Sequence, residues 1–114
     1  MILRNPRTGA VLAHRVERAR APLARLRGLL GRSALPEGEA LVIEPCASIH
    51  TFFMRFPIDA AFLSHDLRVV RAIADLKPWR ATLPHRGAAM VVELPGGTLA
   101  RTGTREGDVL SVEG

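Results

Sequence analysis

A thiol, a hydroxyl and an imidazole occur at alternate positions near the start of residues 46–63. In an extended strand alternate side chains share one face, so Cys46, Ser48 and His50 would line one side of a strand. A cysteine beside a histidine is the basis of thiol nucleophilic catalysis, in which the imidazole takes the proton of the thiol. This segment therefore holds either a site or a polar seam in a small core.

Strand geometry argues against a Cys–His nucleophile. At a rise of ~3.3 Å per residue, the Cα atoms of Cys46 and His50 would lie about 13 Å apart, so direct contact would need a bend or a bulge. A buried cysteine behaves more often as a small hydrophobic residue than as a nucleophile. Ser48 lacks the sequence context of a nucleophile elbow, which makes hydroxyl catalysis the weaker hypothesis.

His50 and Asp59 form the more plausible pair. Pro57 donates no backbone hydrogen bond and is expected to divide the segment into two strands, at residues 46–54 and 58–63. Two neighbouring strands can bring the two side chains together. In one interpretation Asp59 accepts hydrogen bonds from buried backbone or from His50 and completes a polar core. In the other, the pair lines a concave pocket.

The pocket interpretation adds side chains from other segments, with Arg55 placed to meet an anionic group of a ligand. We expect Glu93 and Asp108 to cap turns or to accept hydrogen bonds from backbone amides. If the domain is a small barrel, either side chain would also reach the same pocket. The predicted pocket wall consists of Cys46, Ser48, His50, Met54, Arg55, Asp59, Trp79 and Glu93.

The sequence predicts no metal site and no cofactor. A single cysteine excludes an internal disulfide and a cysteine-rich structural zinc site. The histidines, His14, His50, His65 and His85, fall in separate predicted elements and lack the spacing of metal ligands on one helix.

Charge and composition restrict the partners. The net charge of +5 and the basic isoelectric point suit an anionic partner, but the cations are spread along the chain and all except Lys77 are arginines. Without a helix-turn-helix pattern, finger spacing or an exposed aromatic platform, we do not expect nucleic acid as a partner. No apolar run approaches the ~18 residues of a membrane span and no signal peptide is visible, which predicts a cytoplasmic protein.

Short apolar segments separated by turns predict one mainly β domain over residues 1–114. We expect a hairpin within residues 2–16, further strands at 40–43, 67–73, 88–94 and 109–112, a helical turn at 98–104, and a loop or edge at 76–83, where Pro78 interrupts. Leucines at helical spacing between Pro22 and Gly31 predict one helix. The fold class is an antiparallel β-sandwich or partly closed barrel with one short α-helix packed against it.

Five motifs follow one another along the chain. They are Arg27-Gly-Leu-Leu-Gly-Arg32, Pro45-Cys-Ala-Ser-Ile-His-Thr-Phe-Phe-Met-Arg-Phe-Pro-Ile-Asp59, Lys77-Pro-Trp79, Glu93-Leu-Pro-Gly-Gly97 and Gly107-Asp108. Together they resemble the domain of unknown function 192 (DUF192) family. The resemblance implies a small, mainly β fold found in bacteria and archaea, often after a signal peptide or membrane anchor, and it implies no reaction.

These observations favour a module that binds a small ligand or a protein partner. Two alternatives stay open: a hydrolase or transferase that uses His50 and Asp59, and a structural or protein-interaction domain. The residue pattern alone leaves open whether any reaction is catalysed.

Overall fold

The computed structural model describes residues 1–20 and 34–114, which form two β-sheets and one short helix. The small sheet has the strand order β2-β1-β8 and consists of β1 (Ile2–Asn5), β2 (Ala10–Ala13) and β8 (Ser111–Glu113). The large sheet has the order β3-β4-β7-β5-β6 and consists of β3 (Arg15–Ala19), β4 (Glu39–Ile43), β5 (Ile58–Leu63), β6 (Val69–Leu76) and β7 (Met90–Pro95). Helix α2 spans Thr98–Thr102.

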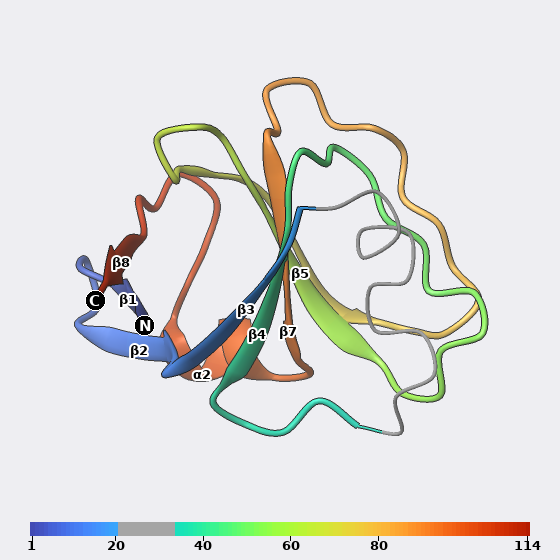
Figure 1. Ribbon diagram of the computed structural model, residues 1–114, viewed down its shortest axis with the longest axis horizontal. Helices are drawn as coiled ribbons and strands as arrows, with labels where there is room; N and C mark the ends of the chain where they lie inside the picture. Colours follow the sequence, from blue (N-terminus) through green and yellow to red (C-terminus); the bar gives the residue numbers. More distant parts are fainter. Residues whose placement is uncertain (21–33) are drawn as a thin grey trace.

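The two sheets pack as an open sandwich. Figure 1 shows the large sheet nearly edge-on, with the small sheet and α2 on one side of it. Ala61 and Leu63 of β5 and Val92 and Leu94 of β7 point into this first core, as the two-residue period of a strand requires. The sheets do not close into a barrel, so the predicted fold class is confirmed in its sandwich form.

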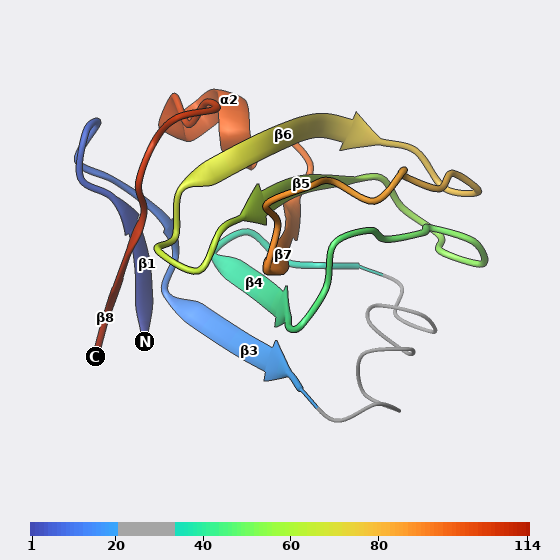
Figure 2. The ribbon, with the colours of Figure 1, turned by 90° about the horizontal axis from the view of Figure 1, so that it is seen from above.

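Two long loops cover the opposite face of the large sheet. Strand β4 ends beside the start of β7, whereas β5 begins beside the end of β7, so residues 44–57 must cross the sheet to connect β4 with β5. Residues 77–89 cross it between β6 and β7 for the same reason. Beneath the loops lies a second core, in which Ile49 and Met54 pack with Ile58, Phe62 and Val91. Figure 2 shows the ends of both loops side by side, beyond the large sheet.

The predicted strand at residues 46–54 is wrong. This segment makes one isolated bridge, between His50 and Ala81, and is otherwise an irregular loop. Its alternating polar side chains resembled a strand, but its neighbour is the equally irregular 77–89 loop rather than a sheet strand. The strand at 58–63, the strands overlapping 40–43, 67–73 and 88–94, and the helical turn at 98–104 are confirmed.

The predicted N-terminal hairpin is confirmed for β1 and β2, but the apolar stretch that follows changes sheets. At His14 the chain leaves the small sheet and continues as β3, the edge of the large one. The carbonyl oxygen of Gly38 accepts hydrogen bonds from the backbone amides of His14 and Arg15, which aligns β3 parallel to β4. The predicted helix between Pro22 and Gly31 lies outside the described residues.

Candidate functional site: an aromatic loop tip

Asp59 is completely buried and holds backbone together. Its Oδ2 accepts a hydrogen bond of 2.8 Å from the amide of Leu99, and its Oδ1 accepts one of 2.9 Å from the amide of Asp75. The first bond satisfies an unpaired donor in the first turn of α2, whose own cap, Gly97, supplies no side chain. Asp59 thus fulfils the interpretation in which it accepts from buried backbone.

Asp59 and His50 do not form a hydrogen-bonded pair. His50 is exposed, and its Nδ1 accepts a hydrogen bond from the amide of Phe52. Asp59 points toward α2 on one face of the large sheet, whereas the 46–54 loop lies over the other face. A buried carboxylate with two backbone donors has no need of the imidazole.

Two further residues of the predicted pocket wall belong to the second core. Met54 is buried there, and Glu93 on β7 lies between Leu41 and Ala60, which belong to the same core. Asp59 and Glu93 therefore occupy opposite faces of the large sheet. The structure divides the predicted pocket wall instead of placing it around one cavity.

Cys46 is half-buried and does not approach His50 as a nucleophile would. Its Sγ donates a hydrogen bond of 2.9 Å to the carbonyl oxygen of Ser48, and its amide donates to Ala89. The thiol hydrogen therefore bonds a local carbonyl.

His50 and Trp79 meet in an exposed aromatic cluster, which we call the aromatic tip: His50, Phe52, Phe53 and Trp79. The His50 and Phe52 rings stack with centroids 5.1 Å apart, and the Phe53 and Trp79 rings are tilted with centroids 4.7 Å apart. Phe53 and Trp79 are nevertheless 70% and 56% exposed. Trp79 was predicted at the site, whereas Phe52 and Phe53 were missed, although their adjacency in the sequence was a signal.

The backbone is strained at two of these exposed aromatic residues. Phe53 and Trp79 have φ angles of 66° and 64°, in the left-handed region that bulky side chains rarely adopt. Each residue lies at the third position of a tight turn, where glycine is the usual residue, and Pro78 precedes Trp79 as expected for such a turn. A left-handed conformation costs about 1–2 kcal/mol for a residue with a Cβ atom. Such strain is typical of functional positions.

Thr51 joins the two loops beneath the tip. Its hydroxyl donates to the carbonyl oxygen of Lys77 over 2.6 Å and accepts from the amide of Arg80 over 2.9 Å. Its backbone amide and carbonyl bond Arg80 and Trp79, respectively. Thr51 is wholly buried, and these four hydrogen bonds join the two turns. No sequence pattern distinguished Thr51 from its neighbours.

Cationic residues occur in the same two loops as the aromatic tip. Arg55 and Arg80 are exposed, and Lys77 pairs with Asp75 at 2.6 Å. Within residues 45–57 and 77–89 there are four cationic residues and no carboxylate. The tip therefore combines exposed aromatic surface with positive charge.

A second polar cluster lies in the small-sheet half of the molecule. Asp108 accepts hydrogen bonds from Arg7, Asn5 and the amide of Arg105, which confirms that it bonds turn backbone. The Arg7 side chain, followed by those other donors, holds the pKa of Asp108 well below its ordinary value against the opposing effect of burial. This cluster joins the β1–β2 turn to the chain before β8 and is structural.

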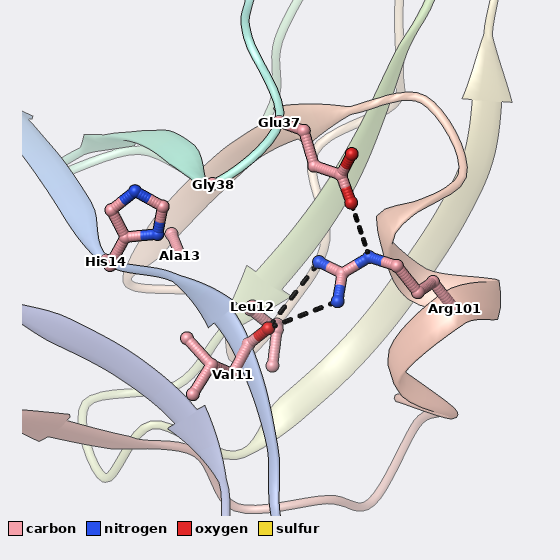
Figure 3. Close-up of a pocket in the computed structure, with 7 residues that line it drawn as sticks. All are labelled: Val11, Leu12, Ala13, His14, Glu37, Gly38 and Arg101. Atoms are coloured by element: carbon pink, nitrogen blue, oxygen red, sulfur yellow. Dashed lines mark hydrogen bonds and ion pairs between the residues drawn. The ribbon is translucent and has the colours of Figure 1, made fainter.

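Three surface depressions of the described residues are lined by no residue of the aromatic tip. One, with a volume of about 390 Å³, contains Arg101, which forms an ion pair with Glu37 and reaches the carbonyl oxygen of Val11 (Figure 3). His14, on the same rim, points away from that ion pair in the close-up. Within residues 1–20 and 34–114, no group of three or more potential ligand side chains is arranged to hold a metal ion.

The sequence model of one family, described as "Uncharacterized ACR", matches residues 3–112. The chain belongs to the DUF192 family. A UPF0127 protein of Thermococcus sibiricus is 32% identical over 98% of this chain and 75% of its own length. A UPF0127 protein of Pyrococcus furiosus is 42% identical over 56% of this chain. The aligned part of this DUF192 chain spans only about half, 54%, of that relative.

Solved structures share the DUF192 fold described above. A Novosphingobium aromaticivorans protein of unknown function superposes with a TM-score of 0.82 at 29% identity, over 97% of this chain and 82% of its own. A Sinorhizobium meliloti protein described as a candidate transcription regulator superposes with a TM-score of 0.81 at 24% identity, over 96% of this chain and 89% of its own. At 24% identity the second likeness shows the fold alone.

Proposed function

We propose that this DUF192 chain is a binding module whose contact surface is the aromatic tip. The observation that carries the proposal is that Phe53 and Trp79 are exposed while their backbones are held in the left-handed region. Glycine at either position would remove the strain, and an apolar ring in water contributes little to folding. A strained and exposed aromatic side chain is therefore best explained by contact with a partner.

The support beneath the tip fits the same role. Binding surfaces are most effective when their side chains are held in place before the partner arrives, because less conformational entropy is then lost. Thr51 fixes the backbone of both loops, and Ile49 and Met54 anchor one loop in the second core. The aromatic tip is thus displayed from a fixed base.

The arrangement gives less support to a hydrolase or transferase. His50 would need a partner to orient its ring and a nucleophile nearby. Asp59 bonds two backbone amides instead, and the Cys46 thiol bonds the carbonyl oxygen of Ser48. His50 instead stacks on Phe52 as a member of the aromatic tip.

A thermal-shift panel tests the proposal. Sugars, nucleotides, carboxylic acids and lipid vesicles are added to the full chain, and at least one is expected to raise the melting temperature. The shift should disappear in Phe53→Ser and in His50→Ala. The matched control, Val112→Ser, changes an exposed apolar side chain in the small sheet and should keep the shift. Failure of every compound, or a shift that persists in both tip variants, would contradict the proposal.

A further inference from the structure

We propose that the aromatic tip docks on the surface of a lipid bilayer that carries anionic headgroups. This inference rests on the proposed function, because it names the partner of the same surface. Such docking is peripheral. Among the described residues, no helix is long and apolar enough to cross a membrane.

The apolar part of the surface is concentrated in the two loops. Phe53, Trp79 and Leu83, with exposed fractions of 70%, 56% and 78%, are the three most exposed large hydrophobic side chains of the described chain. All three belong to the neighbouring loops at residues 44–57 and 77–89, whose ends project beyond the large sheet (Figure 2). Aromatic and leucine side chains of this kind enter the boundary between headgroups and acyl chains. Tryptophan is favoured there because its ring is apolar and its N–H is polar.

The charged part of the surface matches anionic headgroups. The loops at residues 44–57 and 77–89 carry Arg55, Lys77, Arg80 and Arg86. Glu44, their one acidic residue, is paired with Arg18 and Arg20, and Lys77 is paired with Asp75, which leaves Arg55, Arg80 and Arg86 as the excess positive charge. The side chains of Arg55 and Arg80 make no hydrogen bond or ion pair with any part of the chain that the structure describes. Each such cation near an anionic membrane strengthens binding about fivefold.

Ring geometry favours a bilayer over single-stranded nucleic acid. Stacking of bases needs open, flat ring faces. Here His50 and Phe52 stack on each other, and Phe53 and Trp79 pack at 58° with centroids 4.7 Å apart, so the rings occupy part of one another's faces. Exposed Leu83 offers apolar surface and no stacking face. A cluster of this shape suits a fluid apolar phase.

Vesicle sedimentation with the full chain tests the inference. The chain is expected to sediment with vesicles of phosphatidylcholine and phosphatidylglycerol in equal parts, and to stay in solution with phosphatidylcholine alone. Added salt should weaken the binding.

Substitutions in the two loops should weaken vesicle binding. Phe53→Ser should lower the bound fraction severalfold. The pair Arg55→Gln and Arg80→Gln should weaken binding by about 25-fold, from about fivefold for each charge. Val109→Ser and Arg105→Gln are matched controls on exposed residues outside the two loops and should bind as the parent does.

Other outcomes overturn the inference. Absence of sedimentation with the anionic vesicles rejects the lipid partner, and so does unchanged sedimentation of Phe53→Ser. If oligothymidylate binds instead and the tip variants lose that binding, the partner is a nucleic acid. The lipid inference can fail while the proposed function holds. This is the case if the vesicles do not bind, or oligothymidylate binds instead, but another compound still gives a thermal shift that the tip variants abolish. Melting temperatures close to that of the parent verify that each variant is folded.

Discussion

At the scale of single residues, two buried carboxylates of this chain, Asp59 and Asp108, accept hydrogen bonds from backbone amides and, for Asp108, from the side chains of Asn5 and Arg7. Asp59, on β5, bonds the backbone of β6 at Asp75 and of α2 at Leu99, and Asp108 accepts hydrogen bonds from Arg7, Asn5 and Arg105. Buried acceptors of this kind matter because their removal leaves donors without partners. Both residues should therefore affect stability before they affect binding.

Replacement of Asp59 by asparagine should lower the free energy of unfolding by about 1–3 kcal/mol. An asparagine side chain has one acceptor oxygen, so either the amide of Leu99 or that of Asp75 would lose its partner. Urea unfolding measures the change. Asp75→Asn is the matched control, because the Asp75 side chain is exposed and its ion pair with Lys77 is a surface contact of small value. Equal stability of Asp59→Asn and the parent would contradict this role.

The lowered pKa of Asp108 predicts that part of the free energy of unfolding is lost in acid. Its folded-state pKa lies below the unfolded value of about 3.9, so the carboxylate stabilises the fold fully at higher pH. That contribution is lost as the pH falls below about 4 toward the folded-state pKa.

Urea unfolding of the parent from neutral to acid pH should therefore show a decline that is shallower in Asp108→Asn, which is already less stable at neutral pH. Glu113→Gln, in an exposed ion pair with Arg4, should follow the parent curve. Parallel curves for the parent and Asp108→Asn would refute the assignment.

At the scale of elements, the buried strands were predictable and the two loops were not. Strands β4, β5 and β7 are apolar runs closed by Pro or turn residues, and that composition predicts buried strands directly. Residues 46–54 alternate as a strand would, but their partners are amides and carbonyls within residues 77–89, some of them bonded through side chains. Local periodicity does not contain that long-range pairing.

The site was predictable only in part for the same reason. The central block and Trp79 were named as candidates, and His50 of that block lies with Trp79 in the aromatic tip. The expected union of His50 with Asp59 assumed two paired strands, whereas the loop carries His50 over one face and β5 presents Asp59 to the other. Thr51, which joins the loops, has no signature at the level of residue type or spacing.

The positive φ of Trp79 predicts that a glycine variant at this position is more stable than an alanine variant. Trp79→Gly should be more stable than Trp79→Ala by about 1 kcal/mol, because glycine adopts a positive φ without strain. Position 52, where Phe52 has no positive φ, is the control, and there alanine should be at least as stable as glycine. Thermal or urea unfolding of the four variants provides the measurement. The same order at both positions would show that residue 79 is unstrained.

The hydrogen bonds of Thr51 predict that a change at this residue in one loop alters the stability of the other loop. Thr51→Val keeps the volume but removes a hydroxyl that bonds Lys77 and Arg80, so we expect a loss of about 1–3 kcal/mol in the free energy of unfolding. The amide of Arg80 should exchange with solvent faster, whereas amides in β1 should not. Thr51→Ser restores the hydroxyl and should recover most of the protection. Protection of Arg80 that is unchanged in Thr51→Val would exclude this role.

At the scale of the whole molecule, the two faces of the large sheet are covered differently. One face packs on the small sheet and α2 around a conventional apolar core. The other face supports two loops whose ends carry strained aromatic side chains among cations. In the function that we propose, the sandwich is the base and the aromatic tip is the surface that contacts a partner.

The intrinsic fluorescence of Trp79 tests this assignment most directly, because the chain has one tryptophan and no tyrosine. In the free protein, acrylamide should quench the emission readily, since Trp79 is 56% exposed. On addition of phosphatidylglycerol-containing vesicles, or of the panel compound that raises the melting temperature, the emission should shift to shorter wavelength and become protected from acrylamide. A bound partner that leaves both the wavelength and the quenching of Trp79 unchanged would show that the aromatic tip is not the contact surface.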